Sequence, residues 1–315
     1  MSKSDPIEKA LNRVGELRHQ APSRTTTDEI RQFLGHRSNL VAAKAAKLAA
    51  ELRGTELIPD LVASFQRFMS NPTQTDRRCA AVTEIVKTLY EFDYVEPDIY
   101  LSGLHHVQLE GSFGPPVDTA ATLRGTSAQG LLRTGYPDAM VEVLPLLVDP
   151  EPAARIGAVR AFTVNGGSAG VLVLRLKALT GDPEPEVLVE CFCGLLSAAP
   201  EHSINFVSAY MEADDSSTSD AAIWALGQSR LKSGFDRLRE KWDRTAARSM
   251  RKTLLGAMAA SRIEEANQFL YSMIAAGENG SDAGDAFEAL SAYKSPDSIT
   301  RAIQEMSRTC RAESH

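Results

Sequence analysis

The sequence predicts an all-α fold, a superhelix of stacked helical hairpins, and three observations support this prediction. The stretch Asp-Pro-Glu-Pro occurs at Asp149 and again 33 residues later at Asp182. The segment from Ile223 is matched 32 residues later by the one from Leu255, and after another 32 by the one from Phe287. Apolar residues recur at helical spacing within each unit. A repeat of roughly 30 to 40 residues is typical of helical repeat proteins.

Composition agrees with such a fold and excludes some function classes. The chain has 315 residues, of which 43% are hydrophobic, 24% are charged and only 6% are aromatic. Alanine and leucine dominate, which favours helices that pack closely on small side chains. The net charge is −7 and the pI is about 5.5. An acidic chain lacks the electrostatic attraction that nucleic acid requires, so we expect no nucleic-acid partner.

Residues 1–35 are expected to form an N-terminal helical cap. Asp5 is the expected N-cap of its first helix, with Pro6 in the first turn and Glu8 three residues after the cap. A short second helix is expected to end at Gly35.

Residues 36–310 are expected to form one continuous array of about eight helical hairpins, followed by a disordered tail at 311–315. The first helices are expected near 39–52, 76–90, 118–133, 152–164, 185–198, 219–229, 246–260 and 282–293. Their partners are expected near 59–69, 97–107, 137–147, 169–179, 201–211, 234–243, 264–275 and 296–307.

The repeated Asp-Pro stretch marks where first helices begin. Asp149 and Asp182 are expected to cap a helix through a side-chain oxygen. Pro150 and Pro183 fit the first turn, where a missing N–H group has no intrahelical partner to lose.

These stretches resemble HEAT-type repeats, including the phycobilisome-lyase-like subgroup. The resemblance covers most of residues 36–307. It rests on the Asp-Pro opening, on the following Arg155, on the small residues Ala158 and Ala161, and on the repeat length.

The resemblance implies an α-α superhelix in which the aspartate and the arginine often bridge successive repeats. Asp149, Asp182 and Arg155 fit this pattern, whereas Glu190 departs from it. For the lyase-like subgroup, the resemblance also implies the handling of a bilin chromophore or of its protein acceptor.

The segment from His105 to Asp118, HHVQLEGSFGPPVD, interrupts the helical pattern and is the main candidate site. His105 and His106 are expected in the last turn of a helix that starts at Pro97, and the rest is a connection about twice as long as the others. Long ordered loops often carry function. The candidate partner-binding residues around it are Tyr100, His105, His106, Gln108, Glu110, Phe113, Asp118 and Arg124.

Three interpretations of this segment remain open. In the first interpretation, one histidine interacts with the helix carboxyl end, the other is solvated, and the glycines and prolines only turn the chain. Alternatively, the segment docks a protein partner with Phe113 as an apolar anchor. The third interpretation is a metal or acid–base site of His105, His106, Glu110 and Asp118, although adjacent histidines on a helix point in different directions.

A basic segment from Asp236 to Lys252 is the second candidate. It holds seven basic and three acidic residues. If one helix continued through it, Arg244, Arg248 and Lys252 would repel each other at four-residue spacing, and an acidic partner would relieve that repulsion. The alternative is a solvated face that is partly neutralised by Glu240 and Asp243.

The second helices are expected to form a concave binding face. The side chains most easily aimed outward from it are Arg175, Lys177, Arg237 and Lys241. Together with Arg244 and Arg248 they complete the predicted partner-binding set.

Other features point away from catalysis, cofactors and membranes. The cysteines, Cys79, Cys191, Cys193 and Cys310, lack the CxxC spacing of zinc and redox sites, and we expect buried reduced thiols. The chain shows no signal peptide and no run of 18 apolar residues, so a cytoplasmic bacterial protein without membrane contact is expected.

The sequence therefore predicts a non-catalytic scaffold or adaptor that binds a protein partner through its concave face and the segment 105–118. We expect no enzyme, no catalytic residue, no resident metal and no cofactor. A bilin-lyase-like or enzyme-assisting role and a metal site at 105–118 are the alternatives. Partner identity and oligomeric state are not predicted.

Overall fold

The computed structural model describes residues 5–21, 23–111, 114–277 and 280–312. In these residues the chain forms nineteen α-helices and four short 3-10 helices, with a single two-stranded hairpin. The predicted all-α repeat fold is confirmed. The chain divides into two compact units, Met1–Gly170 and Val171–His315, and the boundary falls inside α11 (Gly167–Thr180).

Unit 1 opens with the helices α1 (Pro6–Leu17) and α2 (Arg24–Leu34). The Asp5 carboxylate accepts a hydrogen bond of 3.0 Å from the backbone N–H of Ile7 and caps α1, as predicted. The Ser23 hydroxyl caps α2 by accepting from the N–H of Thr26.

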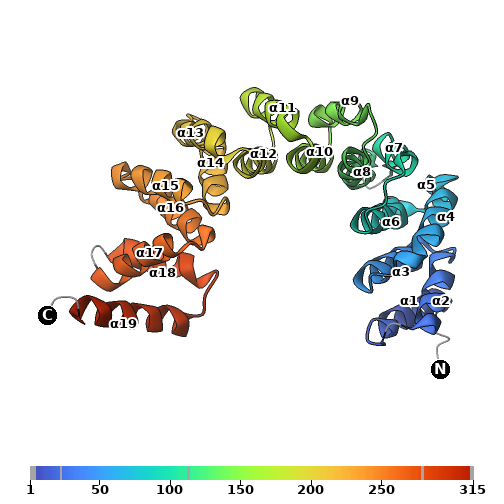
Figure 1. The fold of residues 1–315 in the computed structure, drawn as a ribbon, viewed down its shortest axis with the longest axis horizontal. Coiled ribbons are helices and arrows are strands. Elements are labelled where there is room, and N and C mark those ends of the chain that lie inside the picture. Colours follow the sequence, from blue (N-terminus) through green and yellow to red (C-terminus); the bar gives the residue numbers. More distant parts are fainter. Residues whose placement is uncertain (1–4, 22, 112–113, 278–279, 313–315) are drawn as a thin grey trace. The chain divides into compact units, whose positions relative to one another are not determined.

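Three further helical hairpins and the first helix of a fourth complete unit 1 (Figure 1). The elements are α3 (Asn39–Glu51), η1 (Thr55–Leu57), α4 (Ile58–Met69), α5 (Pro72–Thr75), η2 (Arg77–Cys79), α6 (Ala80–Glu91), α7 (Pro97–Leu104), β1 (Leu109–Glu110), β2 (Val117–Asp118), α8 (Ala121–Arg133), α9 (Ala139–Val143), η3 (Leu144–Val148) and α10 (Pro152–Asn165).

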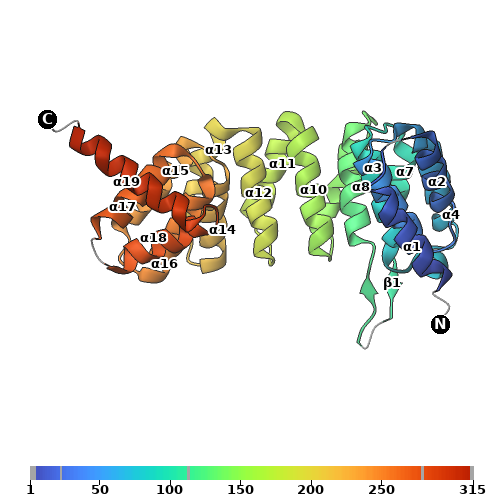
Figure 2. The same cartoon turned by 90° about the horizontal axis from the view of Figure 1, so that it is seen from below.

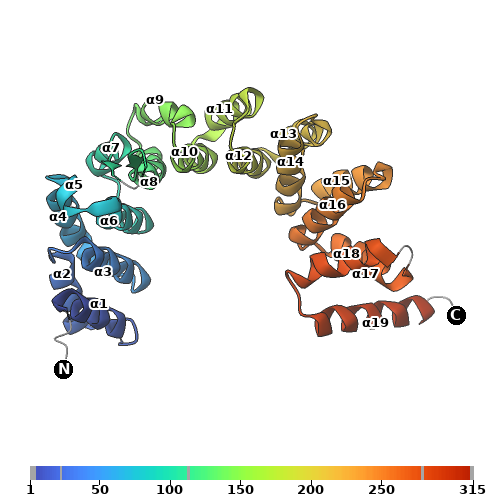
Figure 3. The same ribbon diagram turned by 180° about the vertical axis from the view of Figure 1, so that it is seen from behind.

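Unit 2 repeats the same pattern of a first helix followed by a second (Figure 3). Its elements after α11 are α12 (Pro185–Ala198), α13 (Pro200–Ala209), η4 (Tyr210–Glu212), α14 (Ser216–Gln228), α15 (Lys232–Arg244), α16 (Arg248–Ser261), α17 (Glu264–Ala276), α18 (Gly280–Ser291) and α19 (Pro296–Ala312).

Within unit 1 the first helices pack directly on one another, α3 on α6, α6 on α8 and α8 on α10. Small side chains allow this close approach. Ala42, Ala45 and Ala46 of α3 are fully buried, and Gly157 of α10 lies against Gly125 of α8. A Cβ atom on Gly157 would lie 2.1 Å from the Gly125 Cα atom.

This packing corrects the predicted position of the concave face. In unit 1 the first helices α3, α6, α8 and α10 lie along the inner side of the curve, and the second helices lie on the outer side (Figure 1). The physical reason is the small residues of the first helices, which bring their axes closer together than the outer row.

The aspartates of the repeated stretch stabilise the turns before the helices instead of capping the helices themselves, as had been predicted. Asp149 accepts from the N–H of Glu151 and Asp182 accepts from the N–H of Glu184, at 2.8 and 2.9 Å. These bonds close the turns that precede α10 and α12. The helices begin two residues after the predicted prolines, at Pro152 and at Pro185, and the residues before them provide no side-chain cap.

Arginine–aspartate bridges join neighbouring first helices. Arg124 of α8 donates two hydrogen bonds of 2.9 Å to the carboxylate of Asp149, just before α10. Arg251 of α16 donates one of 2.7 Å to Asp282 of α18. The resemblance implied bridges of this kind between repeats.

Candidate functional site

The interrupting segment is a β-hairpin rather than a loop. Strand β1 pairs antiparallel with β2, with Leu109 opposite Asp118 and Glu110 opposite Val117. The hairpin extends beyond the ends of the neighbouring helices of unit 1 (Figure 2). Two boundaries are therefore corrected: α7 ends at Leu104, before both histidines, and the next helix starts at residue 121 because residues 117–118 are paired in the strand.

The base of the hairpin contacts a buried polar network. The Gln108 side chain is 1% exposed, and its amide donates to the backbone oxygen of Asp76 at 2.9 Å. Asp76 is fully buried, and its carboxylate accepts from the N–H groups of Ala81 and Val82 and from the amide of Asn39. The hairpin is thus tied to the turn that starts α6.

Glu110 accepts hydrogen bonds both from residues of the hairpin base and from the turn that precedes α6. Its carboxylate accepts from the Gln108 amide at 2.7 Å, from the Thr119 hydroxyl at 3.1 Å and from the N–H of Arg78. Burial alone would raise the pKa of Glu110, but these hydrogen bonds outweigh it and the pKa lies below its ordinary value. The carboxylate is therefore stabilised in its ionised form.

The Glu110 contact coincides with an uncommon backbone conformation. Arg78 and Cys79 both adopt left-handed φ values, 60° and 50°. Each costs about 1–2 kcal/mol for a residue with a side chain, so neighbouring contacts must hold them in place. The bond from the Arg78 N–H to Glu110 is one such contact. Burial raises the pKa of the Cys79 thiol to about 12, which leaves it protonated and unreactive.

Asp118 and Arg124 form the other half of the base. Arg124 is 4% exposed and donates to Asp118 at 2.6 Å, to the backbone oxygen of His106 and to Asp149. Burial alone would raise the pKa of Asp118, but hydrogen bonds from the Ala120 N–H and from Arg124 lower it overall. One buried guanidinium therefore joins the hairpin to α8 and to the start of the next repeat.

The two histidines lie apart. The exposed His105 ring lies 3.0 Å from the Glu142 carboxylate, whereas the His106 ring lies 3.1 Å from the Gln108 side-chain oxygen. Among the described residues, no group of three histidine, cysteine or acidic side chains is arranged to hold a metal ion. The proposed metal alternative at 105–118 therefore gains no support from this geometry.

Three aliphatic side chains of the hairpin face solvent. Val107 is 59% exposed, Leu109 is 62% exposed and Val117 is 52% exposed. The predicted anchor Phe113 lies outside the described residues. The sequence interpretation missed Val107, Leu109 and Val117, although Val-Gln-Leu-Glu alternates apolar and polar residues as a strand does.

Four predicted contact residues are corrected because the structure buries them. Tyr100 is fully buried, donates to the backbone oxygen of Tyr94, and fills space that Gly130 leaves open. Lys177 is 8% exposed and pairs with Asp182 at 2.7 Å. Like Tyr100 and Lys177, Gln108 and Arg124 belong to the interior. Their long polar or aromatic side chains satisfy internal groups instead of facing a partner.

The remaining basic candidates lie at or near the surface of unit 2. Arg175 of α11 stacks over the Phe206 ring at 4.4 Å, and Arg237 of α15 donates to Asn205 at 2.7 Å. The segment 236–252 is not one helix, because α15 ends at Arg244 and α16 begins at Arg248. The condition for repulsion between Arg244, Arg248 and Lys252 along a continuous helix is therefore not met.

Most of the basic segment is neutralised by carboxylates. Six of its seven cations have a carboxylate partner within 4 Å: Arg237–Glu240, Arg239–Asp243, Lys241–Glu212, Arg248–Asp285, Arg251–Asp282 and Lys252–Glu288. Arg244 differs, since in the described chain its recorded bond goes to the backbone oxygen of Glu240. Three of the acidic partners come from α18, which the sequence interpretation did not consider.

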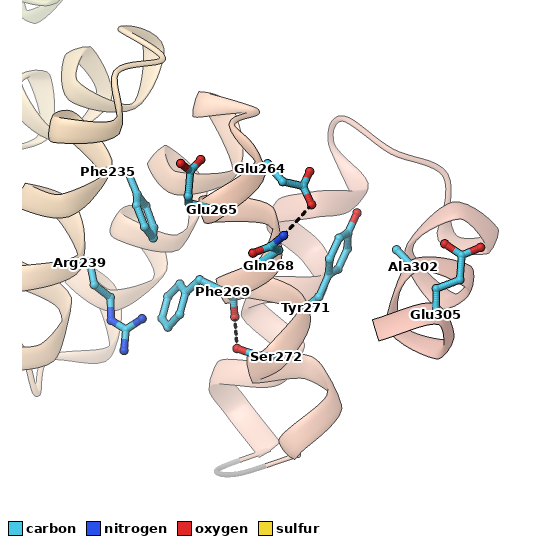
Figure 4. Close-up of a pocket in the computed structure, with 10 residues that line it drawn as sticks. All are labelled: Phe235, Arg239, Glu264, Glu265, Gln268, Phe269, Tyr271, Ser272, Ala302 and Glu305. Atoms are coloured by element: carbon cyan, nitrogen blue, oxygen red, sulfur yellow. Dashed lines mark hydrogen bonds between the residues drawn. The ribbon is translucent and has the colours of Figure 1, made fainter. Parts of the chain in front are cut away.

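A large surface cavity of unit 2 lies between α15, α17 and α19 (Figure 4). Its volume is about 760 Å³. Phe269 forms one wall, with the Arg239 guanidinium 3.8 Å from its ring centre. Gln268 donates to Glu264 at 3.1 Å, so polar groups of the wall already bond to each other. Its lining also carries charged side chains of both signs, with Arg239 among three glutamates.

Comparison with known proteins gives matches of fold only. No protein-family model matches the chain, and no curated protein matches it. Among solved structures, the complex of CpcE and CpcF of phycocyanin lyase from Nostoc sp. PCC7120 matches with 15% identity and a TM-score of 0.37, covering 92% of this chain and 97% of that one. Human deoxyhypusine hydroxylase in complex with glycerol matches with 16% identity and a TM-score of 0.30, covering 82% and 92%.

The first match bears the name of a phycocyanin lyase. The two matches also correct one expectation. Both matched proteins bear the names of enzymes, a lyase and a hydroxylase. The expectation that the chain is not an enzyme is therefore wrong, because a repeat fold does not by itself imply a non-catalytic role. Within the described residues, no helix is long and apolar enough to cross a membrane.

Proposed function

We propose that this chain binds a protein partner and that the β-hairpin at residues 107–118 is its principal contact. One observation carries the proposal: the base of the hairpin is fixed by buried charged groups, while its aliphatic side chains are more than half exposed. Val107, Leu109 and Val117 are the proposed contact residues. Glu110 and Asp118 position them.

The energetics of association favour such a surface. An isolated two-stranded hairpin is marginally stable in water, so its conformation here depends on the network at its base. A contact surface that is ordered before binding loses less conformational entropy on association. Exposed aliphatic side chains then provide apolar area to bury against a partner, at about 25 cal/mol per Å².

The basic surface of unit 2 is the second candidate contact. Its proposed residues are Arg175, Arg237, Lys241, Arg244 and Arg248. It ranks below the hairpin because its cations are mostly paired within the chain, and a partner would have to displace those carboxylates. Arg244 is the cation best placed to meet a new acidic group.

Site-specific crosslinking tests the proposal. A photoreactive amino acid replaces Leu109 in one version of the protein and Arg244 in another, and each is irradiated in extracts of the natural host. We expect a discrete crosslinked protein from position 109. The double substitution Val107→Ser and Val117→Ser should remove that product, while Arg244→Glu with Arg248→Glu should leave it unchanged. A product that forms only from position 244 would refute the hairpin as the principal contact.

A further inference from the structure

A second cavity of unit 2, separate from the hairpin, has the features of a ligand site. It is lined mainly by the first helices α14, α16 and α18, and its volume is about 490 Å³. That volume falls in the range of about 300–1,000 Å³ that is typical of small-ligand sites. Its walls include Trp224 from α14, Gly256 from α16, Ala289 from α18 and Tyr293 just after that helix.

The lining of the cavity includes one buried carboxylate with an oxygen that lacks a hydrogen-bond partner among the described residues. Asp285 is 7% exposed and lines the cavity. Its Oδ2 atom is buried and has no hydrogen-bond partner among the described residues. The nearest cation is Arg248, whose Nε atom lies 3.6 Å away, too far for a hydrogen bond, on a side chain that is 72% exposed.

An unbonded buried carboxylate oxygen is costly, and each such group in a folded protein calls for an explanation. The neighbouring acid does not need the same explanation, because Glu288 accepts from Lys252 at 2.9 and 3.0 Å. The unpartnered oxygen therefore belongs to a cavity lined by aromatic rings and small residues, together with the Lys252–Glu288 ion pair. That combination suits a cationic donor head on an aliphatic stem, since aromatic faces attract ammonium groups.

We propose that this cavity binds a primary ammonium group on an aliphatic chain, as a lysine side chain presents it, with Asp285 accepting its N–H and Trp224 lining the stem. Gly256 keeps the cavity open. A Cβ atom there would lie 3.2 Å from the edge of the Trp224 ring, so a larger side chain would fill the space beside it.

Titration calorimetry with lysine whose α-amino and carboxyl groups are blocked tests the site. We expect saturable binding that is weakened at least about tenfold by Asp285→Asn, because a hydrogen bond to a charged group is lost. Asp236→Asn, which removes an exposed carboxylate on α15, should bind like the wild type. The same blocked lysine acetylated on its side chain, which has no charge, should not bind.

A second amine shows which part of the ligand is recognised, and a second variant shows whether lost binding results from misfolding. Binding of n-butylamine would show that head and stem suffice. Binding of only the blocked lysine would show that peptide groups contribute as well. Gly256→Leu leaves the Asp285 side chain unchanged but fills the space beside Trp224, and it should also abolish binding at unchanged helix content. The proposal is overturned if neither amine binds, if the acetylated form binds equally, or if Asp285→Asn or Gly256→Leu binds like the wild type.

Discussion

At the scale of single residues, Arg124 is the side chain on which the candidate site depends most. It is buried, and it neutralises Asp118 and Asp149 at once. Breaking a buried ion pair from one side leaves a charge without compensation, which costs far more than the pair itself contributes. Removing Arg124 would therefore leave the carboxylates of Asp118 and Asp149 without their buried counter-charge.

We predict that Arg124→Ala lowers the free energy of unfolding by about 3–5 kcal/mol. Denaturant unfolding followed by circular dichroism measures it. Arg237→Ala is the matched control, because its ion pair with Glu240 is exposed and worth about 1 kcal/mol at most. Equal effects of the two substitutions would show that the Arg124 network is not structural.

A pH dependence follows from Glu110 and Asp118. Their pKa values in the folded protein lie below the ordinary values of 4.5 and 3.8. Groups of this kind contribute stability that is complete above their ordinary pKa and is lost as the pH falls through the lowered one. We predict that the difference in unfolding free energy between the wild type and Glu110→Gln with Asp118→Asn is full at pH 6 and shrinks below about pH 4. A difference that stays constant down to pH 2 would contradict this.

At the scale of elements, most helices were predictable because their signals are local. The predicted ranges 39–52, 152–164 and 185–198 agree with α3, α10 and α12 to within a residue. Apolar spacing and the proline at the first helical position are properties of the chain itself, independent of its neighbours. Hence the repeat length and the helical layers follow from the sequence.

The hairpin and its network were not predictable in the same way. The strands contain two residues each, too few for an alternation signal to decide. Asp76 and Asp149 lie far from the hairpin in sequence and meet it only through the stacking of successive repeats. The residues that present the candidate surface could be named from sequence only in part, because long-range contacts decide which of them are buried.

The contact between α8 and α10 gives a prediction about packing. Gly157→Ala should lower the unfolding free energy by about 1–3 kcal/mol, because the added Cβ would meet the backbone of Gly125 and force the helices apart. Gly284→Ala in α18 is the control. No atom lies within 4 Å of its added Cβ, so higher helix propensity should stabilise the protein by up to about 1 kcal/mol. Thermal denaturation measures both, and stabilisation by Gly157→Ala would refute the close contact.

At the scale of the whole molecule, the two units can be followed separately. Both tryptophans, Trp224 and Trp242, lie in unit 2, whereas helices occur in both units. In repeat proteins, stability is approximately a sum of contributions from single repeats and their nearest neighbours. A local change therefore need not affect the entire chain equally.

We predict that Gly157→Ala shifts the unfolding midpoint seen by circular dichroism more than the midpoint seen by tryptophan fluorescence. The substitution lies in unit 1 and the fluorescent residues do not. Non-coincident transitions are the established sign of a departure from two-state unfolding. If both midpoints moved together by the same amount, the units would unfold as one cooperative body.

The clamp made by Asp76, Gln108, Arg124 and Asp149 has a mechanical consequence. It ties the start of α6, the hairpin and the start of α10 into one rigid block. Stacked repeats deform most easily where few hydrogen bonds and ion pairs connect them. We therefore expect tension along unit 1 to separate the helical repeats outside residues 76–149 first. The hairpin would then keep its orientation on α8 while the rest of the unit flexes around it.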